Sequence, residues 1–332
     1  MQHHGVLLVN LGTPEAPTQA GVGKFLREFL IDSRVIDLPT WLRYVLVYIL
    51  IVPFRSRKLA RAYKLIWDSN GSPLLINSYS LVNALQLSLG SQYIVALGMR
   101  YGQPSLSTAL HALDTCNKIT ILPLYPQYSS AATGSAIEKI LSLLNHFPHY
   151  PNVQLIRDFY QHSGFIIPQS ELIALYLPDH DYILFSFHGL PLRQLHASCR
   201  KPCAGICPKN NNAYSEPACY RAQCFATARA IANQIDIPEH QYSVVFQSRL
   251  GNTQWIEPYI EHILPQLAAK GVKHLMVACP SFVTDCLETL DEIGIRVRRH
   301  WLLLGGVKLT LVPCLNDNQQ WIAGVKEICG FY

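Results

Sequence analysis

The most informative absences from this 332-residue chain are of charge and of nucleotide-binding motifs. Only 15% of the residues are charged, and the net charge of +5 is dispersed, without a basic run or a patch that mixes basic and aromatic residues. We therefore set nucleic acid aside as a partner. No G-x-G-x-x-G sequence follows the first predicted strand, and no Walker sequence occurs. These absences argue against a dinucleotide or nucleoside-triphosphate enzyme, although flavodoxin-like sheets bind ligands without either motif.

Long apolar runs are also absent. The first residues have neither a basic region nor a sufficiently long apolar region, so we predict no signal peptide. The longest apolar stretch, Trp41–Phe54, contains Arg43 and Pro53 and is too short to span a bilayer. Three interpretations stay open for it: an interfacial segment, the wall of an apolar pocket, or a buried core helix. We expect a cytoplasmic protein with, at most, peripheral contact with the inner face of the membrane.

A large core is available, because 49% of the residues are hydrophobic. Short apolar runs alternate with helical patterns in two successive sets of four. The predicted strands are Val6–Leu11, Tyr93–Leu97, Lys118–Leu124 and Val153–Phe159, then Tyr182–Phe187, Tyr242–Gln247, Val272–Ala278 and Val307–Val312. This alternation predicts an α/β fold of two similar domains, each with a four-stranded parallel sheet, and a cleft between them. We place the domains at 1–163 and 164–315, and expect a helix at 316–332 to pack back on the first.

A histidine stands at the end of the fifth predicted strand. The run Tyr182–Phe187 leads to His188, and Gly189 and Pro191 then end the strand. Ligands of open α/β sheets bind beyond the carboxyl ends of the strands, so His188 occupies a position where chemistry is expected. The alternative is a histidine that only hydrogen-bonds the turn, since histidine serves both structure and proton transfer.

Three carboxylates recur in the sequence CPSFVTDCLETLDEIG, after the seventh predicted strand. A helix starting at Asp285, capped by Thr284 or Ser281, would place Asp285, Glu288 and Glu292 on one face. The alternative is a solvated acidic face near a helix N-terminus. Because this helix follows a strand that shares an edge with His188, we expect a histidine facing carboxylates, which suits proton transfer and metal binding.

A series of motifs runs in order from the N-terminal region to near residue 293. They are LLVNLGTPEAPT (Leu7–Thr18), FLREFLIDSRVID (Phe25–Asp37), GSPL (Gly71–Leu74), ALGMRYGQPS (Ala96–Ser105), LPLYPQYSSAATGS (Leu122–Ser135), FSFHGLP (Phe185–Pro191), FQSRLGNTQWIEPY (Phe246–Tyr259) and CPSFVTDCLETLDEI (Cys279–Ile293). As a set they are highly specific and resemble the ferrochelatase family. The resemblance implies a lyase that inserts Fe²⁺ into protoporphyrin IX, releasing two protons and forming protohaem in the last step of haem biosynthesis. It implies two Rossmann-like domains without a nucleotide.

The resemblance also implies the site. His188 and Glu288 match the pair that faces across the porphyrin and contacts the metal, and Asp285 and Glu292 match an acidic relay. The positions that match the porphyrin pocket are Leu11, Arg100, Tyr101, Tyr125 and Trp255. Fe²⁺ and a porphyrin are then substrates, no cofactor is required for the chemistry, and a porphyrin-supplying enzyme is a candidate partner. No oligomeric state is predicted.

Two alternatives stay open within this resemblance. Coproporphyrin III could be the metal acceptor, although Leu11 stands where that branch of the family tends to carry tyrosine. The chain could instead be a haem-binding, porphyrin-binding or iron–sulfur sensor protein on the same scaffold. The presence of both His188 and Glu288 argues against this second alternative.

The chain departs from the family pattern in a cysteine-rich insertion at about 196–219. Five of the ten cysteines lie between Cys199 and Cys224, which suggests a metal rather than a disulfide framework. Because some ferrochelatases carry a [2Fe–2S] cluster, we favour a cluster over zinc or unliganded thiols. The expected ligands are Cys199, Cys203, Cys207 and Cys219, with Cys224 as the alternative fourth. Two roles stay open for such a metal site: a structural clamp, or a sensor of redox state or iron.

Overall fold

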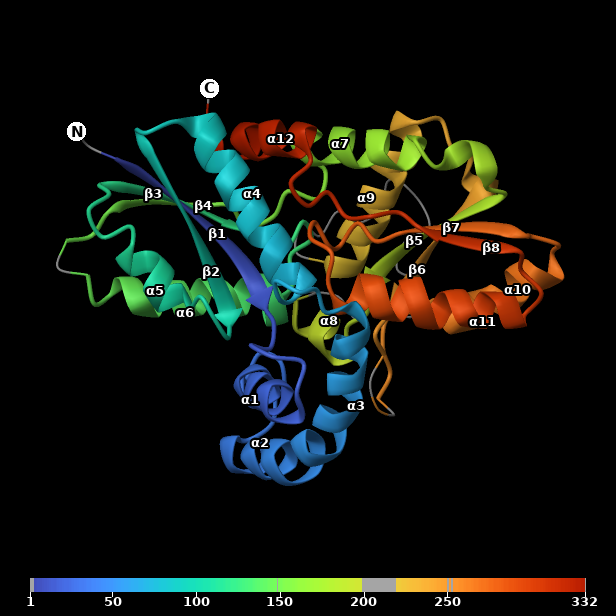
Figure 1. The fold of residues 1–332 in the computed structure, drawn as a ribbon, viewed down its shortest axis with the longest axis horizontal. Coiled ribbons are helices and arrows are strands. Elements are labelled where there is room, and N and C mark those ends of the chain that lie inside the picture. Colours follow the sequence, from blue (N-terminus) through green and yellow to red (C-terminus); the bar gives the residue numbers. More distant parts are fainter. Residues whose placement is uncertain (1–2, 148, 199–218, 250, 252, 332) are drawn as a thin grey trace. The chain divides into compact units, whose positions relative to one another are not determined.

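The computed structural model describes residues 3–147, 149–198, 219–249, 251 and 253–331. It confirms the predicted α/β fold with two four-stranded parallel sheets (Figure 1). The first sheet contains β1 (His4–Gly12), β2 (Tyr93–Tyr101), β3 (Lys118–Pro123) and β4 (Asn152–Leu155). The second contains β5 (Tyr182–His188), β6 (Tyr242–Gln247), β7 (His274–Ala278) and β8 (Lys308–Leu311). The strand orders are β2-β1-β3-β4 and β6-β5-β7-β8, so the same topology occurs twice.

The chain forms two compact units, each built around one sheet. Unit 1 comprises residues 1–125, 130–157 and 316–318, and unit 2 comprises residues 126–129, 158–315 and 319–332. Parallel strands are covered on both faces, which explains why the central strands are near-continuous apolar runs. In β1, for example, Val6 and Leu7 are fully buried although they point to opposite faces.

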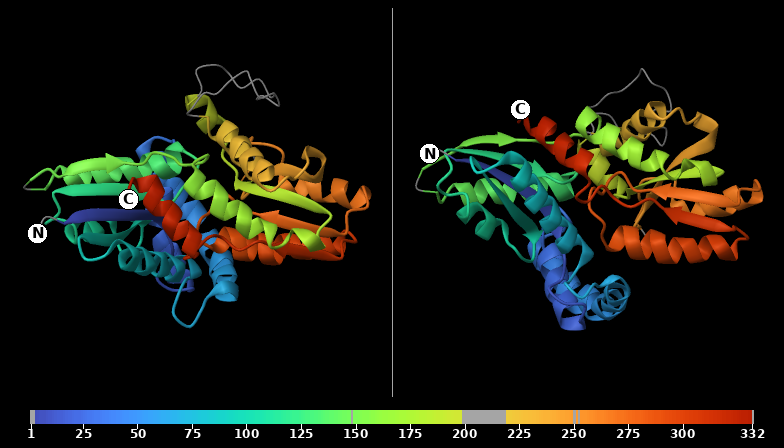
Figure 2. Two further views of the ribbon diagram at one scale, coloured as in Figure 1. Left: turned by 90° about the horizontal axis from the view of Figure 1, so that it is seen from above. Right: turned by 45° about the horizontal axis from the view of Figure 1, so that its top comes forward.

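The unit 1 sheet is covered by helices on both faces. Its helices are α1 (Gln19–Leu30), α2 (Thr40–Val45), η1 (Leu46–Ile51), α3 (Val52–Ile66), α4 (Pro73–Leu89), α5 (Leu106–His111), η2 (Ser130–Gly134) and α6 (Ser135–Leu144). Apolar residues of α5 and α6 pack with Leu7 and Val9 of β1, and α4 contacts β1 and β2. The helices α1 to α3 lie between β1 and α4 in the chain and form a separate projection (Figures 1 and 2).

Unit 2 repeats this arrangement. Its helices are α7 (Ser163–Ala174), η3 (Leu177–Asp179), α8 (Leu192–Ser198), α9 (Tyr220–Gln234), η4 (Glu239–Gln241), α10 (Ile260–Ala269), η5 (Glu288–Val297), α11 (Arg298–Leu303) and α12 (Gln319–Cys329). The apolar residues of α10, η5 and α11 form one core with β5, β6, β7 and β8. The helix α12 packs against α7, and α7 also contacts α9.

The apolar stretch Trp41–Phe54 is not a core helix. It runs through α2 and η1 into α3, and several of its large side chains are exposed, including Trp41 (70%), Ile49 (61%) and Phe54 (76%). In the described part of the chain, no helix is both long enough and apolar enough to cross a membrane.

The helix that follows β7 differs from the prediction. Residues Glu288–Val297 form a π-helix, η5, and Asp285 precedes it in a loop. The expected α-helical face that joins Asp285, Glu288 and Glu292 is therefore wrong. A π-helix bonds each residue to the fifth along instead of the fourth, so its wider turn changes which residues share a face. π-Helical segments occur frequently at functional sites.

Candidate active site

His188 is the last residue of β5 and is half-buried at the carboxyl edge of the unit 2 sheet. Its Nδ1 lies 2.6 Å from the carbonyl oxygen of Gly189. A carbonyl oxygen only accepts hydrogen bonds, so Nδ1 carries the proton and donates it. Nε2 is then the unprotonated nitrogen of the neutral ring, and no described residue hydrogen-bonds it. The backbone thus selects the tautomer in which Nε2 can accept a proton or bind a metal.

Aromatic side chains surround the turn after His188. The ring of Phe282 lies edge-on to the histidine ring, with 6.3 Å between the ring centroids. Trp255 is 8% exposed and forms a β-bridge with Pro191. A Cβ added to Gly189 would lie 3.4 Å from the Trp255 ring. Trp255 therefore lies beside the turn that carries His188.

One buried amide connects the elements that carry His188 and Glu288. Gln247, at the end of β6, pairs with His188 in the sheet. Its side-chain oxygen accepts a hydrogen bond from the Ser186 hydroxyl at 2.6 Å. Its side-chain nitrogen donates to the carbonyl oxygen of Glu288 at 2.8 Å. Gln247 therefore fixes the first residue of η5 against β5 and β6.

Glu292 is held by the residue that follows β6. Its two carboxylate oxygens accept hydrogen bonds from the backbone N–H of Ser248 at 2.9 Å and from its hydroxyl at 2.6 Å. Burial raises the pKa of Glu292, while the Ser248 hydrogen bonds and the Arg296 charge oppose the rise and the nearby Glu288 carboxylate adds to it. Glu288 and Glu292 are therefore electrostatically linked neighbours on η5.

Asp285 connects the start of η5 to the segment after β8. Its buried carboxylate accepts a hydrogen bond from the Thr289 hydroxyl at 3.0 Å. Both oxygens also lie 3.3 Å from the backbone nitrogen of Cys314. These contacts give Asp285 an anchoring role in the loop, and its role in an acidic relay stays a prediction.

The predicted pocket residues of unit 1 gather at the carboxyl edge of its own sheet. Leu11 is near the end of β1, Arg100 and Tyr101 end β2, and Tyr125 follows β3. Tyr101 is fully buried, and the buried hydroxyl of Tyr125 has no hydrogen-bond partner within the part of the chain that is described. Burial raises the pKa of both tyrosines, so both remain neutral. Their role in a porphyrin pocket stays a prediction.

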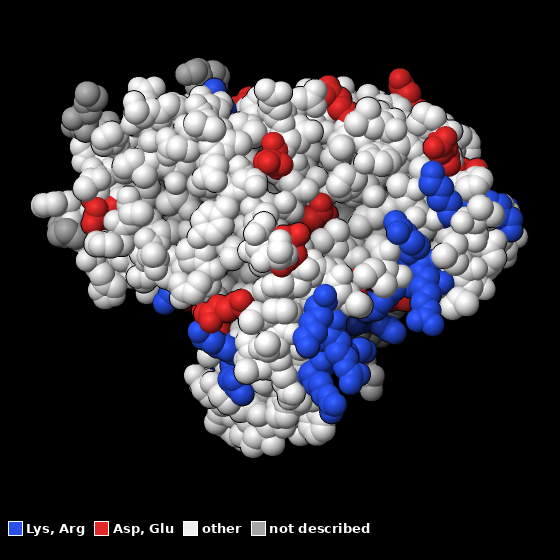
Figure 3. Space-filling model, in the orientation of Figure 1, with Lys and Arg blue, Asp and Glu red and all other residues white. Residues whose placement is uncertain are grey.

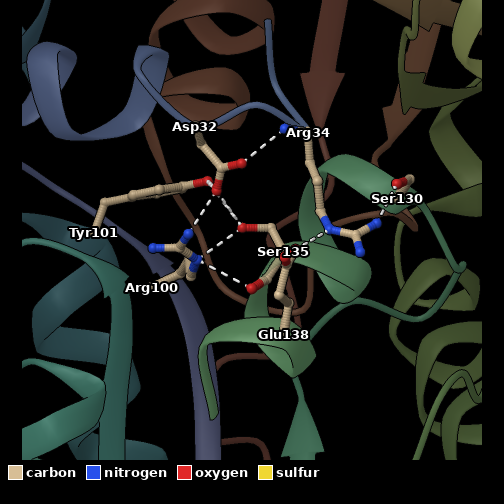
Figure 4. A network of polar contacts seen from close by, with 7 residues as sticks. All are labelled: Asp32, Arg34, Arg100, Tyr101, Ser130, Ser135 and Glu138. Carbon is tan, nitrogen blue, oxygen red and sulfur yellow. Dashed lines mark hydrogen bonds and ion pairs between the residues drawn. The ribbon is translucent and has the colours of Figure 1, made fainter. Parts of the chain in front are cut away.

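Arg100 and Tyr101 belong to a buried polar network centred on Asp32 (Figure 4). One Asp32 oxygen accepts from Arg100 Nη2 at 2.5 Å, from the Tyr101 hydroxyl at 2.8 Å and from the Ser135 hydroxyl at 2.5 Å. The other Asp32 oxygen accepts a hydrogen bond from the backbone N–H of Arg34 at 2.8 Å. Burial alone would raise the pKa of Asp32, but these hydrogen bonds and the Arg100 charge outweigh it and lower the pKa. The positive charge of Arg100 is thus already balanced within unit 1.

Only part of the predicted cysteine ligand set can be placed. Cys199, Cys203 and Cys207 lie outside the described residues. Cys219 directly precedes α9, Cys224 lies in its second turn, and both are buried. Among the residues that the structure describes, no group of three or more His, Cys, Asp or Glu side chains is arranged to hold a metal.

The sequence motifs contain Asp32, Ser135, Gln247 and Ser248, but no role was predicted for any of these four residues. The position of Gln247 and Ser248 was predictable, because they are polar residues at the end of a predicted strand, where ligands bind. Asp32 and Ser135 are separated by about a third of the chain, and no local pattern shows that they touch.

A sequence model of the ferrochelatase family matches residues 3–330. Among curated proteins, the chain is similar to a ferrochelatase of Legionella pneumophila (strain Paris), with 52% identity over 98% of both chains. It is also similar to a ferrochelatase of Coxiella burnetii (strain Dugway 5J108-111), with 44% identity over 98% of this chain and 92% of the relative. The fold resembles that of the sirohydrochlorin chelatase SirB from Bacillus subtilis subspecies spizizenii in complex with cobalt, with a TM-score of 0.54, 10% identity and coverage of 99% and 96%.

Proposed function

The chain belongs to the ferrochelatase family, and from that premise we propose that it inserts Fe²⁺ into protoporphyrin IX with His188 and Glu288 as the catalytic pair. The observation that supports this most is the contact between Nδ1 of His188 and the Gly189 carbonyl oxygen, which leaves Nε2 as the acceptor nitrogen of the neutral ring at the carboxyl edge of a sheet. Gln247 fixes the first residue of η5 beside that edge, and this residue is Glu288. An imidazole base and a carboxylate are thus built onto neighbouring elements of unit 2.

Metal insertion requires two pyrrole protons to leave while Fe²⁺ loses its water ligands. Nε2 of His188 can accept one of these protons, because that nitrogen is unprotonated in the neutral tautomer that carries its proton on Nδ1. The Glu288 carboxylate supplies a hard oxygen ligand and balances charge as the protons leave. Glu292 continues the acidic set along η5, and its raised pKa makes it a suitable proton carrier. We propose that Glu292 carries protons away from the site and that the buried Asp285 is the second member of this relay.

The porphyrin pocket is proposed to include Leu11, Arg100, Tyr101, Tyr125 and Trp255. The neutral tyrosines and Trp255 can pack against an apolar macrocycle. A site complementary to a distorted macrocycle would lower the barrier, because distortion exposes the pyrrole nitrogens. Because Asp32 already balances Arg100, that arginine would shape the pocket rather than supply net charge.

The test is anaerobic Fe²⁺ insertion into protoporphyrin IX, with coproporphyrin III assayed in parallel. We expect His188→Ala and Glu288→Gln each to lower the insertion rate by about a hundredfold or more, while porphyrin binding remains. His240→Ala and Glu239→Gln are matched controls, because both residues are exposed in η4. Faster metallation of coproporphyrin III would reassign the substrate. Porphyrin binding without metallation by the unaltered protein would instead support a binding or sensor protein.

The cysteine-rich segment is proposed to hold a [2Fe–2S] cluster, with zinc as the alternative. The described cysteines fit a thiolate site in one respect: Cys219 and Cys224 are both buried at the start of α9. When bound, a cluster would supply a structural clamp or a redox response.

Visible absorption and the iron, sulfide and zinc content of the anaerobically purified protein test this proposal. We expect Cys219→Ser to lose the absorption and Cys116→Ser, a buried control in unit 1, to keep it. Stoichiometric zinc without iron would select the alternative. Absence of both metals would overturn the proposal.

We also propose that α2, η1 and α3 contact an anionic membrane surface on the cytoplasmic side. Exposed apolar side chains of this segment include Trp41 in α2 and Phe54 in α3, and Phe54 directly precedes the basic residues of α3 in the chain. Figure 3 shows lysine and arginine side chains gathered over α3. Apolar side chains next to basic ones are the features of a segment that binds at a lipid interface.

Vesicle flotation tests the membrane proposal. We expect binding to phosphatidylglycerol vesicles, weaker binding to phosphatidylcholine vesicles, and a loss with Phe54→Ser. Leu87→Ser is the control, because Leu87 is a similarly exposed apolar residue on α4. Equal binding of both variants would contradict the assignment to this segment.

A further inference from the structure

We propose that Tyr220 is a positioning residue for His188, acting through the backbone to keep the histidine ring in its reactive orientation. The inference rests on the proposed role of His188 in metal insertion. Tyr220 is the first residue of α9 and is buried. Its hydroxyl donates a hydrogen bond to the carbonyl oxygen of His188 at 2.8 Å.

This hydrogen bond fixes one end of a peptide group whose other end is also fixed. The carbonyl of His188 and the N–H of Gly189 belong to one planar peptide unit. The N–H of Gly189 donates to the backbone carbonyl of Gln247 at 2.8 Å. Tyr220 and Gln247 therefore hold this peptide plane from opposite sides. Without the Tyr220 donor, the Gln247 contact is the one hydrogen bond from the described residues that would still hold this peptide plane.

The orientation of this peptide group decides the state of the histidine ring. The next carbonyl, that of Gly189, is the acceptor that keeps the proton on Nδ1 of His188. The position of this carbonyl relative to the ring depends on ψ of His188 and φ of Gly189, the two dihedral angles that flank the peptide plane. A rotation that changes these angles would therefore release the tautomer. A side chain at residue 189 would not fit, since its Cβ would lie 2.8 Å from the Gln247 carbonyl oxygen.

A second contact holds His188 on its other side. Its backbone N–H donates to the hydroxyl of Ser281 at 3.1 Å, and Ser281 comes from the loop between β7 and η5. Tyr220 and Ser281 thus bind the carbonyl and the N–H of the same residue from two different elements. The hydroxyl of Tyr220 also interacts with Ser281, so the two contacts support each other.

Tyr220 also links His188 to the start of α9. The helix is tied to residues 126–129 by a hydrogen bond of 2.6 Å from the Tyr128 N–H to the Gln223 side chain. Cys219 directly precedes Tyr220 in the chain. A displacement of the first turn of α9 would therefore be transmitted to the His188 carbonyl.

Tyr220→Phe tests the proposal, with Tyr182→Phe as the matched control. Tyr182 lies at the opposite end of the same strand, and its hydroxyl likewise donates to a backbone carbonyl, that of Tyr242, at 3.0 Å. Both variants lose one such hydrogen bond, so we expect similar shifts in melting temperature. We expect kcat for Fe²⁺ insertion to fall about tenfold to a hundredfold in Tyr220→Phe only. KM for the porphyrin should stay within about twofold in both variants.

Histidine-selective ¹⁵N–¹H correlation spectra give a readout that does not depend on activity. We expect a single His188 tautomer, protonated at Nδ1, in the unaltered protein and in Tyr182→Phe, and a mixture in Tyr220→Phe. The His188 signal is assigned by its absence from His188→Ala. Ser281→Ala should shift the tautomer in the same direction and serves as the second variant if Tyr220→Phe does not fold.

An unchanged tautomer and an unchanged kcat in Tyr220→Phe would overturn the proposal, as would an equal loss of kcat in the control. Failure of the proposed function is distinguishable, because the unaltered protein would then not metallate any porphyrin. The tautomer measurement would still decide whether Tyr220 positions the ring.

Discussion

Asp32 uses both of its carboxylate oxygens to hold three separate segments of unit 1 together. These are the loop after α1, the end of β2 and the start of α6. The side chains of Asp32 and Arg100 are only 6% and 16% exposed, so the ion pair between them is largely removed from water. Removing one partner of such a pair leaves the other charge buried without compensation.

We therefore expect Asp32→Asn to lower the free energy of unfolding by about 3 kcal/mol at neutral pH. Urea unfolding measures this change. Glu15→Gln is the control, because the Glu15–Lys24 ion pair is exposed on both sides and its loss should have no measurable effect. Equal effects of the two substitutions would contradict the assignment of a buried charge network.

The difference between Asp32→Asn and the unaltered protein should also depend on pH. The pKa of Asp32 is lower in the folded protein than the ordinary value of 3.8. The stabilisation is then complete above that value and is lost as the pH falls through the folded pKa. Unfolding curves measured at decreasing pH should converge, and curves that stay parallel would argue against ionised Asp32.

The position of a single functional side chain could be predicted where that residue lies at the end of a predicted strand. His188, Arg100 and Tyr125 follow apolar runs, so their place at a carboxyl edge could be read from the sequence. The partners of these residues could not be, because Asp32 and Tyr220 are brought in by tertiary packing. The tautomer of His188 likewise depends on the direction of one carbonyl, which no sequence pattern encodes.

At the scale of the secondary structure, η5 carries the acidic residues and Ser248 binds it to the end of β6. Ser248 adopts a left-handed backbone conformation (φ 67°), which turns its N–H and hydroxyl toward Glu292. A left-handed conformation is uncommon for a residue other than glycine, and such positions concentrate at functional sites. The strand end and the π-helix are therefore joined through one carboxylate.

Glu292→Gln should remove a pH-dependent loss of stability. Burial raises the pKa of Glu292 above its ordinary value of 4.5. As the pH rises from 4.5 to the folded pKa, the unfolded chain loses this proton and the folded protein keeps it, so the free energy of unfolding falls. Urea unfolding over this window should show the fall in the unaltered protein and not in Glu292→Gln. Glu239→Gln, an exposed control, should follow the unaltered protein.

The elements differ in how well the sequence predicted them. Every predicted strand is present. The central strands were the clearest, because buried parallel strands are apolar along their length, whereas the edge strands β4 and β8 are partly exposed. The helix α7 was not predicted, since Pro168 lies inside it and proline normally ends a helix. The π-helical form of η5 was not predicted either, because an apolar period near that of an α-helix does not distinguish the two hydrogen-bond patterns.

For the whole molecule, unit 2 depends on residues far apart in the chain. The helices α7 and α12 pack with two glycines in contact, Gly164 and Gly324. A Cβ added to Gly324 would lie 1.8 Å from the carbonyl oxygen of Gly164. The two helices can approach this closely only because neither residue has a side chain there.

Gly324→Ala should lower the free energy of unfolding by about 1–3 kcal/mol, because the helices must move apart. Gly23→Ala is the control, since Gly23 also lies in a helix and its added Cβ would meet nothing closer than 3.5 Å. The control should raise stability by about 0.5–1 kcal/mol, the usual gain from alanine in a helix. Thermal unfolding measures both changes, and the same sign in both variants would contradict the tight packing.

The pairing of α7 with α12 has a consequence for synthesis on the ribosome. The sequence of α7 is translated before every strand of the second sheet, whereas α12 is translated after the last of them. A nascent chain therefore carries α7 throughout the synthesis of the second sheet without the helix that covers it. That helix includes Trp321, whose ring centroid lies 6.1 Å from that of Phe165. Phe165 and its apolar neighbours then form a surface that chaperones can bind during this interval.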